Sequence, residues 1–232
     1  MTSSRLLLVP ALAALWFLLP GCAVLDDIKA RQARAREDRA HAELRAQAAA
    51  EHTAFQAKPG WKGDTYRNEP LLKHATSENI RVEIGLNEQR GLLLVHGAIA
   101  MDFPVSSGRK SHPTPTGSYT ILGKKKDYRS NLYGKIHDPE GVVVIEDADS
   151  RTHEVPEGGS FVGSSMPYWM RLTNSGVGLH VGYVPGGRGA SHGCIRLRRK
   201  TAAYLFDLVE IGTPVVIAAK VPALDEPPVK AR

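Results

Sequence analysis

The sequence has few cysteines, few aromatic residues and no strong charge bias. Two cysteines in 232 residues exclude a scaffold stapled by several disulfides. The net charge of +6 is a mild bias toward acidic partners, and the basic run Lys124–Lys126 has no interleaved aromatic residues, so no nucleic-acid interface is indicated. With 42% hydrophobic and 23% charged residues, the chain is too apolar for disorder and too polar for a multispanning membrane protein. We therefore expect one folded domain with appendages.

A long apolar run lies at the N-terminus, where Leu6–Leu19 follows the basic residue Arg5. The run is too short to span a bilayer core, so residues 1–21 are predicted to be a signal peptide. It ends in the sequence LLPGC at residues 18–22, which resembles the lipobox of bacterial lipoproteins. That resemblance implies cleavage before Cys22 and lipidation of its thiol and its new amino group. A plain secretory signal is the alternative.

A lipid on Cys22 would have two consequences. It would hold the protein at a membrane surface without a spanning helix. Because residue 23 is Ala and not Asp, the resemblance to enterobacterial lipoproteins implies the outer rather than the inner membrane, on the periplasmic face of the cell envelope. It would also leave Cys194 as a free thiol in an oxidising compartment, which suggests a chemical role for that thiol.

Residues 26–57 are rich in Ala, Arg, Glu and Gln and have high helix propensity. They contain too few large apolar residues for a core-facing stripe, so we expect a solvated helix that spaces the domain from the membrane. A partner helix in a coiled coil is the alternative. The predicted flanking segments are the lipidated Cys with its helical spacer and linker over 22–78, and a flexible, Pro-rich tail over 220–232.

Between residues 79 and 219 the pattern changes to short strands separated by turns. The predicted strands are 80–86, 92–95, 98–105, 118–121, 142–145, 179–183 and 214–217. One amphipathic helix is predicted over Leu197–Glu210, with Gly212 as its stop signal. The domain is therefore expected to be mainly β with a single helix late in the chain.

The residues best suited to chemistry lie between His180 and Arg198. Cys194 directly precedes the predicted helix, so the positive end of the helix dipole and nearby Arg side chains are expected to favour its thiolate. The backbone N–H groups of His192, Gly193 and Cys194 can converge on one point, as a tetrahedral oxyanion requires, and Gly193 permits a tight turn. His180, on the preceding predicted strand, is the candidate base.

His180 followed by SHGCIR at residues 191–196 resembles the signature of the L,D-transpeptidase (YkuD-type) catalytic domain family. Further segments similar to that domain are residues 105–108 (VSSG), 114–119 (TPTGSY) and 166–170 (MPYWM). The resemblance covers nearly all of residues 79–219 and implies a YkuD-like β-sandwich with one helix after the catalytic cysteine. The loop 181–190 is shorter than in many members, which implies a subgroup with its own acceptor choice.

The family resemblance implies acyl transfer on tetrapeptide stems of peptidoglycan. A cysteine attacks the bond that follows an L-centred diamino acid, D-Ala leaves, and an amine resolves the thioester, with His180 oriented by the backbone carbonyl of Val181. Carried over by position, the catalytic residues are Cys194, His180 and His192, the oxyanion and substrate supports are Gly193, Ser191 and Arg196, and the substrate wall is Tyr168 and Trp169. No cofactor or metal is implied. The implied partners are stem peptides, the membrane through Cys22 and a wall-attached protein as one acceptor.

Several alternatives stay open at this point. Crosslinking, attachment of a protein and hydrolysis differ only in which nucleophile reaches the thioester, and a non-catalytic tethering lipoprotein would need no thiol. A zinc site from His180, His192 and Cys194 would lack a fourth ligand. Tyr168 and Trp169 suit a core as well as a substrate wall. Acylation of Cys194 by carbapenems is a further expectation from the resemblance.

Overall fold

The computed structural model describes residues 21–225, with side chains from 24 to 224. The chain divides into two compact units, residues 1–41 and 42–232. Three predictions fall outside the described residues: the signal peptide up to residue 20, the side chain of Cys22, and the end of the tail beyond residue 225. No helix in the described part of the chain has both the length and the apolar character needed to span a membrane.

Helix α1 (Gly21–Gln56) confirms the predicted Ala-rich helix. After Gly21 its sequence contains no Gly or Pro, so good helix formers continue without a break. In the first unit its described side chains from residue 24 to 40 are exposed, and Asp27 and Arg31 form a surface ion pair at 2.8 Å. Local propensity and pairs of this kind stabilise this part of the helix.

Ten strands of the second unit form one continuous mixed sheet. The predicted meander is confirmed, since β2 (Ile80–Gly85), β3 (Arg90–Val95) and β4 (Ala98–Ser106) pair antiparallel in chain order. The other strands of this sheet are β1 (Tyr66–Arg67), β5 (Gly117–Thr120), β6 (Gly123–Lys125), β10 (Trp169–Arg171), β11 (Gly178–Val181), β12 (Ile195–Leu197) and β13 (Pro214–Ala218). The short helical elements are η1 (Trp61–Gly63), α2 (Glu69–Leu72) and α4 (Pro222–Asp225).

The strand order is β5-β13-β2-β3-β4-β12-β11-β10-β6, with β1 paired to β4. β12 joins the strands from β5 to β4 with the strands from β11 to β6, because it pairs antiparallel with β4 and parallel with β11. The prediction of a mainly β domain is therefore confirmed. The strands that we expected to form a β-sandwich belong instead to one hydrogen-bonded sheet. Its largest apolar cluster includes Ile84, Phe103, Leu179 and Ile195.

Helix α3 (Arg199–Leu208) begins two residues later than predicted, because Ile195–Leu197 forms β12. Ile195 and Leu197 are fully buried on either side of a less buried Arg196, which is the alternation of a strand. The prediction that the helix starts at Leu197, directly after the SHGC segment, is therefore wrong. The single helix after the cysteine is present, but a strand separates the two.

The end of α1 belongs to the second unit and is buried there, contrary to the prediction of a solvated helix. Ala48, His52 and Phe55 expose at most 8% of their surface. The Tyr66 hydroxyl donates a hydrogen bond to the Ala48 carbonyl at 3.2 Å, and the His52 ring lies beside those of Phe55 and Tyr66. A small Ala permits close approach, and a polar side chain is buried where it finds a partner, so counting large apolar residues missed this packing.

A buried ion pair between Arg90 and Asp102 lies beside the packed end of α1. Arg90 on β3 and Asp102 on β4 are 1% and 0% exposed, and the guanidinium lies 2.7 Å from one carboxylate oxygen. The other oxygen lies 2.8 Å from Nε2 of His52. Arg90 also donates to the carbonyls of Lys62 and Asp64. Burial lowers the Arg90 pKa, and the charge and hydrogen bond of Asp102 oppose this, so the carboxylate stabilises the buried cation.

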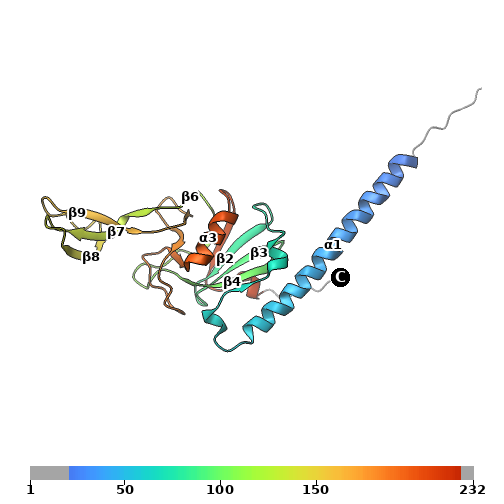
Figure 1. The fold of residues 1–232 in the computed structure, drawn as a ribbon, viewed down its shortest axis with the longest axis horizontal. Helices are drawn as coiled ribbons and strands as arrows, with labels where there is room; N and C mark the ends of the chain where they lie inside the picture. Colours follow the sequence, from blue (N-terminus) through green and yellow to red (C-terminus); the bar gives the residue numbers. More distant parts are fainter. Residues whose placement is uncertain (1–20, 226–232) are drawn as a thin grey trace, which may run out of the picture. The chain divides into compact units, whose positions relative to one another are not determined.

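Strands β7 (Arg129–His137), β8 (Val143–Asp149) and β9 (Ser160–Ser165) form a separate antiparallel sheet. We call residues 129–165 the arm, and Figure 1 shows it extending away from the larger sheet. The sequence predicted only a part of β8. β7 and β9 were missed because they carry mostly polar side chains and few of these are buried, so neither has the apolar alternation of a half-buried strand.

Candidate active site

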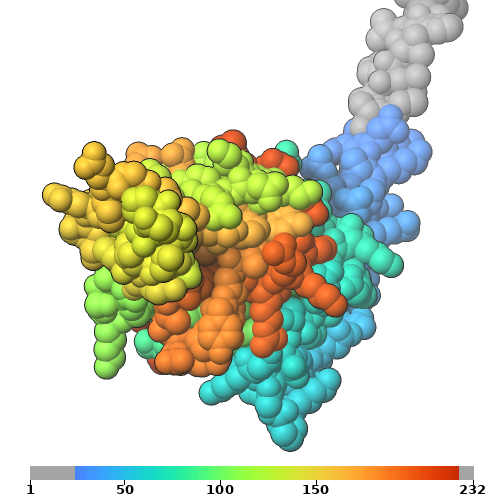
Figure 2. Space-filling view, turned by 60° about the vertical axis from the view of Figure 1, so that its left-hand side comes forward, coloured from blue at the N-terminus to red at the C-terminus, as the bar shows by residue number. Residues whose placement is uncertain are grey.

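A cavity of about 370 Å³ lies between the arm and the larger sheet. Its wall includes arm residues such as Tyr133 and Arg151, together with Cys194, His180 and His192. Figure 2 shows the surface hollowed beside the arm, which is drawn in yellow. The fold therefore brings the three residues predicted to be catalytic to one enclosure.

His180 lies on β11 and is 6% exposed. Its Nδ1 is 2.8 Å from the carbonyl oxygen of Val181, the contact that the resemblance implied. Because a carbonyl only accepts hydrogen bonds, this contact places the proton on Nδ1 and leaves a lone pair on Nε2. Burial lowers the pKa of His180 to about 4, the Val181 carbonyl opposing and the Arg196 charge adding to the effect. The ring is therefore neutral near neutral pH.

Cys194 lies just before β12 and is only partly exposed. Burial raises the pKa of its thiol, while a backbone hydrogen bond with Gly178 and the charge of Arg196 oppose the increase. The prediction of a thiolate favoured by a helix N-terminus is wrong, because α3 begins only at Arg199, after an intervening strand. The resting site consequently holds a neutral thiol near a neutral imidazole.

Hydrogen bonds from two hydroxyl groups hold the turn that carries Cys194. The Ser191 hydroxyl donates to the Cys194 carbonyl and accepts from the Gly193 N–H at 3.0 Å. Thr114 donates to the Gly193 carbonyl at 2.7 Å and accepts from the Gly108 N–H at 2.8 Å. Gly193 has φ of 110°, a left-handed conformation that favours glycine, as the turn prediction required. Since the Gly193 N–H is bound within the turn, the amides of His192 and Cys194 are the ones left for a ligand.

Arg196 lies beside His180, because the two are partners in the parallel register of β12 and β11. Its side chain lines the cavity, and its aliphatic stem passes so close to Gly182 that a Cβ there would lie 2.7 Å from it. Burial lowers the Arg196 pKa, and the charges of Cys194 and Asp147 oppose this. In the described part of the chain its guanidinium makes no hydrogen bond or ion pair, so the cavity holds a cation suited to an anionic group.

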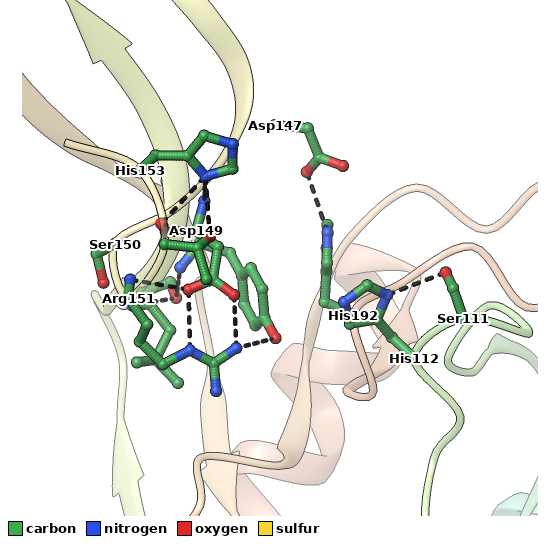
Figure 3. A network of polar contacts seen from close by, with 12 residues as sticks. Ser111, His112, Asp147, Asp149, Ser150, Arg151, His153 and His192 are labelled. Atoms are coloured by element: carbon green, nitrogen blue, oxygen red, sulfur yellow. Dashed lines mark hydrogen bonds and ion pairs between the residues drawn. The ribbon is translucent and has the colours of Figure 1, made fainter. Parts of the chain in front are cut away.

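His192 connects the turn to Arg109 and Asp147, two residues that could not be identified from the sequence. Its Nε2 lies 2.6 Å from Nη2 of Arg109 and 3.1 Å from Oδ1 of Asp147, the latter contact being drawn in Figure 3. Burial lowers the His192 pKa, and Asp147 opposes this. Arg109 lies 83 residues before His192 and 38 before Asp147, so no local sequence pattern links the three.

Tyr168 and Trp169, predicted as a substrate wall, do not line this cavity. Trp169 is 8% exposed and stacks on Tyr128 at 4.0 Å between ring centroids. Tyr168 meets the ring of Phe206 edge-on. The core alternative fits both residues, whereas Tyr128 and Tyr133, which the sequence did not single out, do line the cavity.

The described residues contain no group of three or more His, Cys, Asp and Glu side chains arranged to hold a metal ion. His180, His192 and Cys194, which the sequence left open as a zinc site, therefore do not form such a group. Cys194 is instead 3.4 Å from the carbonyl oxygen of Gly176, and His180 is held by Val181.

Comparison with known proteins identifies relatives of this domain. Probable L,D-transpeptidase 3 of Mycobacterium tuberculosis is 31% identical over 121 residues, which cover 49% of this chain and 37% of that protein. L,D-transpeptidase 1 of the same organism is 32% identical over 128 residues, covering 53% and 43%. The chain thus spans less than half the length of these relatives.

Solved structures show the same similarity. An L,D-transpeptidase from Mycobacterium smegmatis is 24% identical with a TM-score of 0.47, over 61% of this chain and 59% of that one. L,D-transpeptidase 1 of Mycobacterium tuberculosis is 25% identical with a TM-score of 0.43, over 60% and 61%. The family model of the L,D-transpeptidase catalytic domain, YkuD, matches residues 79–217. With more than half of its residues inside that match and the SHGC turn at the wall of its cavity, the chain belongs to the YkuD family of L,D-transpeptidase catalytic domains.

Proposed function

We propose that this protein is a cysteine L,D-transpeptidase that acts on the tetrapeptide stems of peptidoglycan. The observation that carries the proposal is that Cys194 and His180 line the same cavity, with Nδ1 of His180 held by the Val181 carbonyl and Nε2 left as a base. A thiol, a base and backbone donors beside one cavity are the parts that acyl transfer requires.

In the first half of the reaction, Nε2 of His180 takes the proton of the Cys194 thiol as Sγ attacks the carbonyl of the L-centred diamino acid. The oxygen of that carbonyl becomes the oxyanion, and we assign the amides of His192 and Cys194 as its hydrogen-bond donors. Collapse of this intermediate breaks the bond to D-Ala, whose amine receives the proton from His180. The product is a thioester on Cys194 and free D-Ala.

In the second half, an acceptor amine attacks the thioester and gives its proton to His180. The Cys194 sulfur then leaves and regains that proton as a thiol, so the enzyme returns to its starting state. An amine of another stem gives a crosslink, an amine of a protein gives attachment to the wall, and water gives hydrolysis. Residues at the start of the short loop 181–190 line the cavity, so this loop influences which acceptor can enter.

Charge around the cavity favours this substrate class. Arg196 projects into the cavity without a partner among the described residues, and Arg188 lies exposed on the loop 181–190. Stem peptides carry carboxylates, which a guanidinium binds in bidentate fashion. We assign Arg196 to a substrate carboxylate, in place of the wall formed by Tyr168 and Trp169.

The proposed setting is the periplasmic face of the cell envelope. We propose a lipid on Cys22 as the anchor, with the outer membrane as its site, after removal of residues 1–21. Residues 22–78 would then lead from the lipid to the catalytic domain at 79–219. The predicted tail begins later than residue 220, because Val221 is buried and residues 222–225 form α4. The packing of residues 48–55 against this domain indicates that its folded part includes the end of α1.

The test is incubation of the purified protein with a disaccharide tetrapeptide that contains diaminopimelate. Release of D-Ala with formation of dimers supports crosslinking, whereas release with tripeptide alone supports hydrolysis, and transfer to an added amine-bearing protein supports attachment. A carbapenem probes the same thiol, and a covalent mass increase should appear on the wild type. If D-Ala is not released under any of these conditions, the proposal is wrong and the tethering alternative gains support.

Because Cys194 and His180 are both neutral at rest, we expect the alkylation rate of the thiol to depend on pH. Because burial raises the Cys194 pKa, alkylation by iodoacetamide should accelerate only in the alkaline range, with a midpoint above the ordinary thiol value of about 8.5. The rate is measured by intact mass in the Cys22→Ser protein, which keeps one thiol. A fast plateau already reached below neutral pH would show a thiolate–imidazolium pair and contradict this expectation.

A further inference from the structure

Asp147 makes the polar contacts that link the arm to the rest of the second unit. One oxygen of Asp147, on β8, accepts hydrogen bonds from Nη1 and Nη2 of Arg109 at 3.0 and 3.1 Å. Its other oxygen lies 3.1 Å from Nε2 of His192 (Figure 3). The described hydrogen bonds and ion pairs between residues 129–165 and the rest of the unit run through this carboxylate.

Aromatic contacts bring the arm to the same imidazole. The ring of Tyr133, on β7, stacks on the ring of His192 with 4.2 Å between centroids and 23° between planes. His112 meets the His192 ring edge-on at 4.8 Å. Two arm strands and the segment 109–112 therefore share one ring of the catalytic turn.

The place of His192 bears on Cys194 because both lie in the same short turn. The Arg109 N–H donates to the Ser191 carbonyl at 2.9 Å, and Gly108 forms a β-bridge with Ser191. Arg109 thus holds the turn through its backbone and the arm through its guanidinium. A shift of His192 passes directly to the amide and thiol of Cys194, where about 1 Å of misplacement is enough to impair catalysis.

We propose that Asp147, acting through Arg109 and His192, is a positioning residue that couples closure of the arm over the cavity to the placement of Cys194. The side chains of Arg109 and Asp147 are 38% and 57% exposed, and a pair this exposed is weak by itself. It can therefore open to admit a peptide and close again, which a buried pair could not do. As far as turnover is concerned, this inference rests on the proposed function.

The chemistry of Nε2 explains why Arg109 and Asp147 act together. A bare Nε2 accepts a hydrogen bond from Arg109, whereas a protonated Nε2 donates to Asp147, so one nitrogen cannot serve both at once. In the neutral ring the guanidinium is bound, and its two N–H groups in turn hold the carboxylate. Removal of either partner therefore breaks the same chain of contacts from the arm to the turn.

The test compares Asp147→Ala, Arg109→Gln and the double variant with a matched control. The control is Glu146→Ala, since Glu146 is the preceding residue of β8 and pairs with Lys135 inside the arm. Turnover is followed as D-Ala release from the tetrapeptide, and arm closure as the rate of Cys194 alkylation by iodoacetamide in the Cys22→Ser background. Thermal unfolding monitors the fold of each variant.

Both single variants should lower kcat by about tenfold, with KM little changed, and should speed alkylation by about threefold, because an open arm uncovers the thiol. The double variant should match the single ones, and Asp147→Glu should recover most of the rate. A purely electrostatic role predicts opposite signs, since loss of the carboxylate favours the thiolate and loss of the guanidinium disfavours it. Opposite alkylation changes, or values equal to those of Glu146→Ala, would overturn the proposal.

The two readouts separate this inference from the proposed function. Alkylation of Cys194 needs no peptidoglycan substrate, so it reports on the coupling even if D-Ala release is never observed. In that case the transpeptidase proposal is wrong, while equal acceleration in Asp147→Ala and Arg109→Gln still supports the link between the arm and the turn.

Discussion

Cys194→Ala is expected to abolish D-Ala release, with a loss of at least about 10³-fold in kcat, because it removes the proposed nucleophile that forms the acyl intermediate. In the described part of the chain Cys194 is the free cysteine, and its thiol lines the cavity. Removing a sulfur atom from a partly exposed position leaves the turn itself intact, since Ser191 and Thr114 hold it through the backbone. Binding of the stem peptide should therefore survive.

The measurement is intact mass together with product analysis. Wild-type protein mixed with the tetrapeptide should show a covalent adduct that is absent in Cys194→Ala, while substrate binding followed by calorimetry stays within a few-fold. Cys22→Ser serves as the matched control, because it removes the other cysteine and should leave turnover unchanged. Retention of a tenth of the activity by Cys194→Ala would rule out the thioester mechanism.

Asp102→Ala is expected to cause the largest loss of stability, about 3–5 kcal/mol, because it leaves a buried guanidinium without its counter-charge. Arg90 is 1% exposed, and burial already works against its charge. His52 loses its partner at the same time, which loosens the end of α1 from the domain. Asp102→Asn should cost less, since an amide oxygen still accepts hydrogen bonds.

The loss is measured from the midpoint and slope of urea unfolding. Glu69→Gln provides the matched control, because Glu69 pairs with Arg67 on the surface at 2.7 Å and is 62% exposed. Exposed pairs contribute about 1 kcal/mol or less, so the control should unfold close to the wild type. Equal midpoints for Asp102→Ala and Glu69→Gln would show that the buried pair adds nothing to the stability of the folded state.

The chemistry of the site could be predicted to the extent that it is local in the sequence. His180 and the turn 191–194 lie within fifteen residues, so motif and spacing alone indicated a thiol with a base. The state of that thiol could not be predicted in the same way. It depends on burial by residues distant in sequence and on whether a helix or a strand follows Cys194, and the structure places β12 there.

Local periodicity also determined much of the fold. Alternation predicted β2, apolar runs that follow turn residues predicted β3 and β4, and the Ala-rich composition predicted α1, because in each case the signal lies within a few residues. The arm was only partly visible. Its strands bury few side chains, so the apolar alternation that marks a strand is largely missing from β7 and β9.

The sequence by itself determined the family, the meander and the long helix, because each is encoded by residues that are neighbours in the chain. Only the tertiary structure decided how these parts work together. Arg90 meets Asp102 and His52 across three elements, and Asp147 reaches Arg109 and His192 from the arm. The Arg90–Asp102 pair forms because folding excludes water from polar groups, which must then find partners. No local pattern specifies the partners in either cluster.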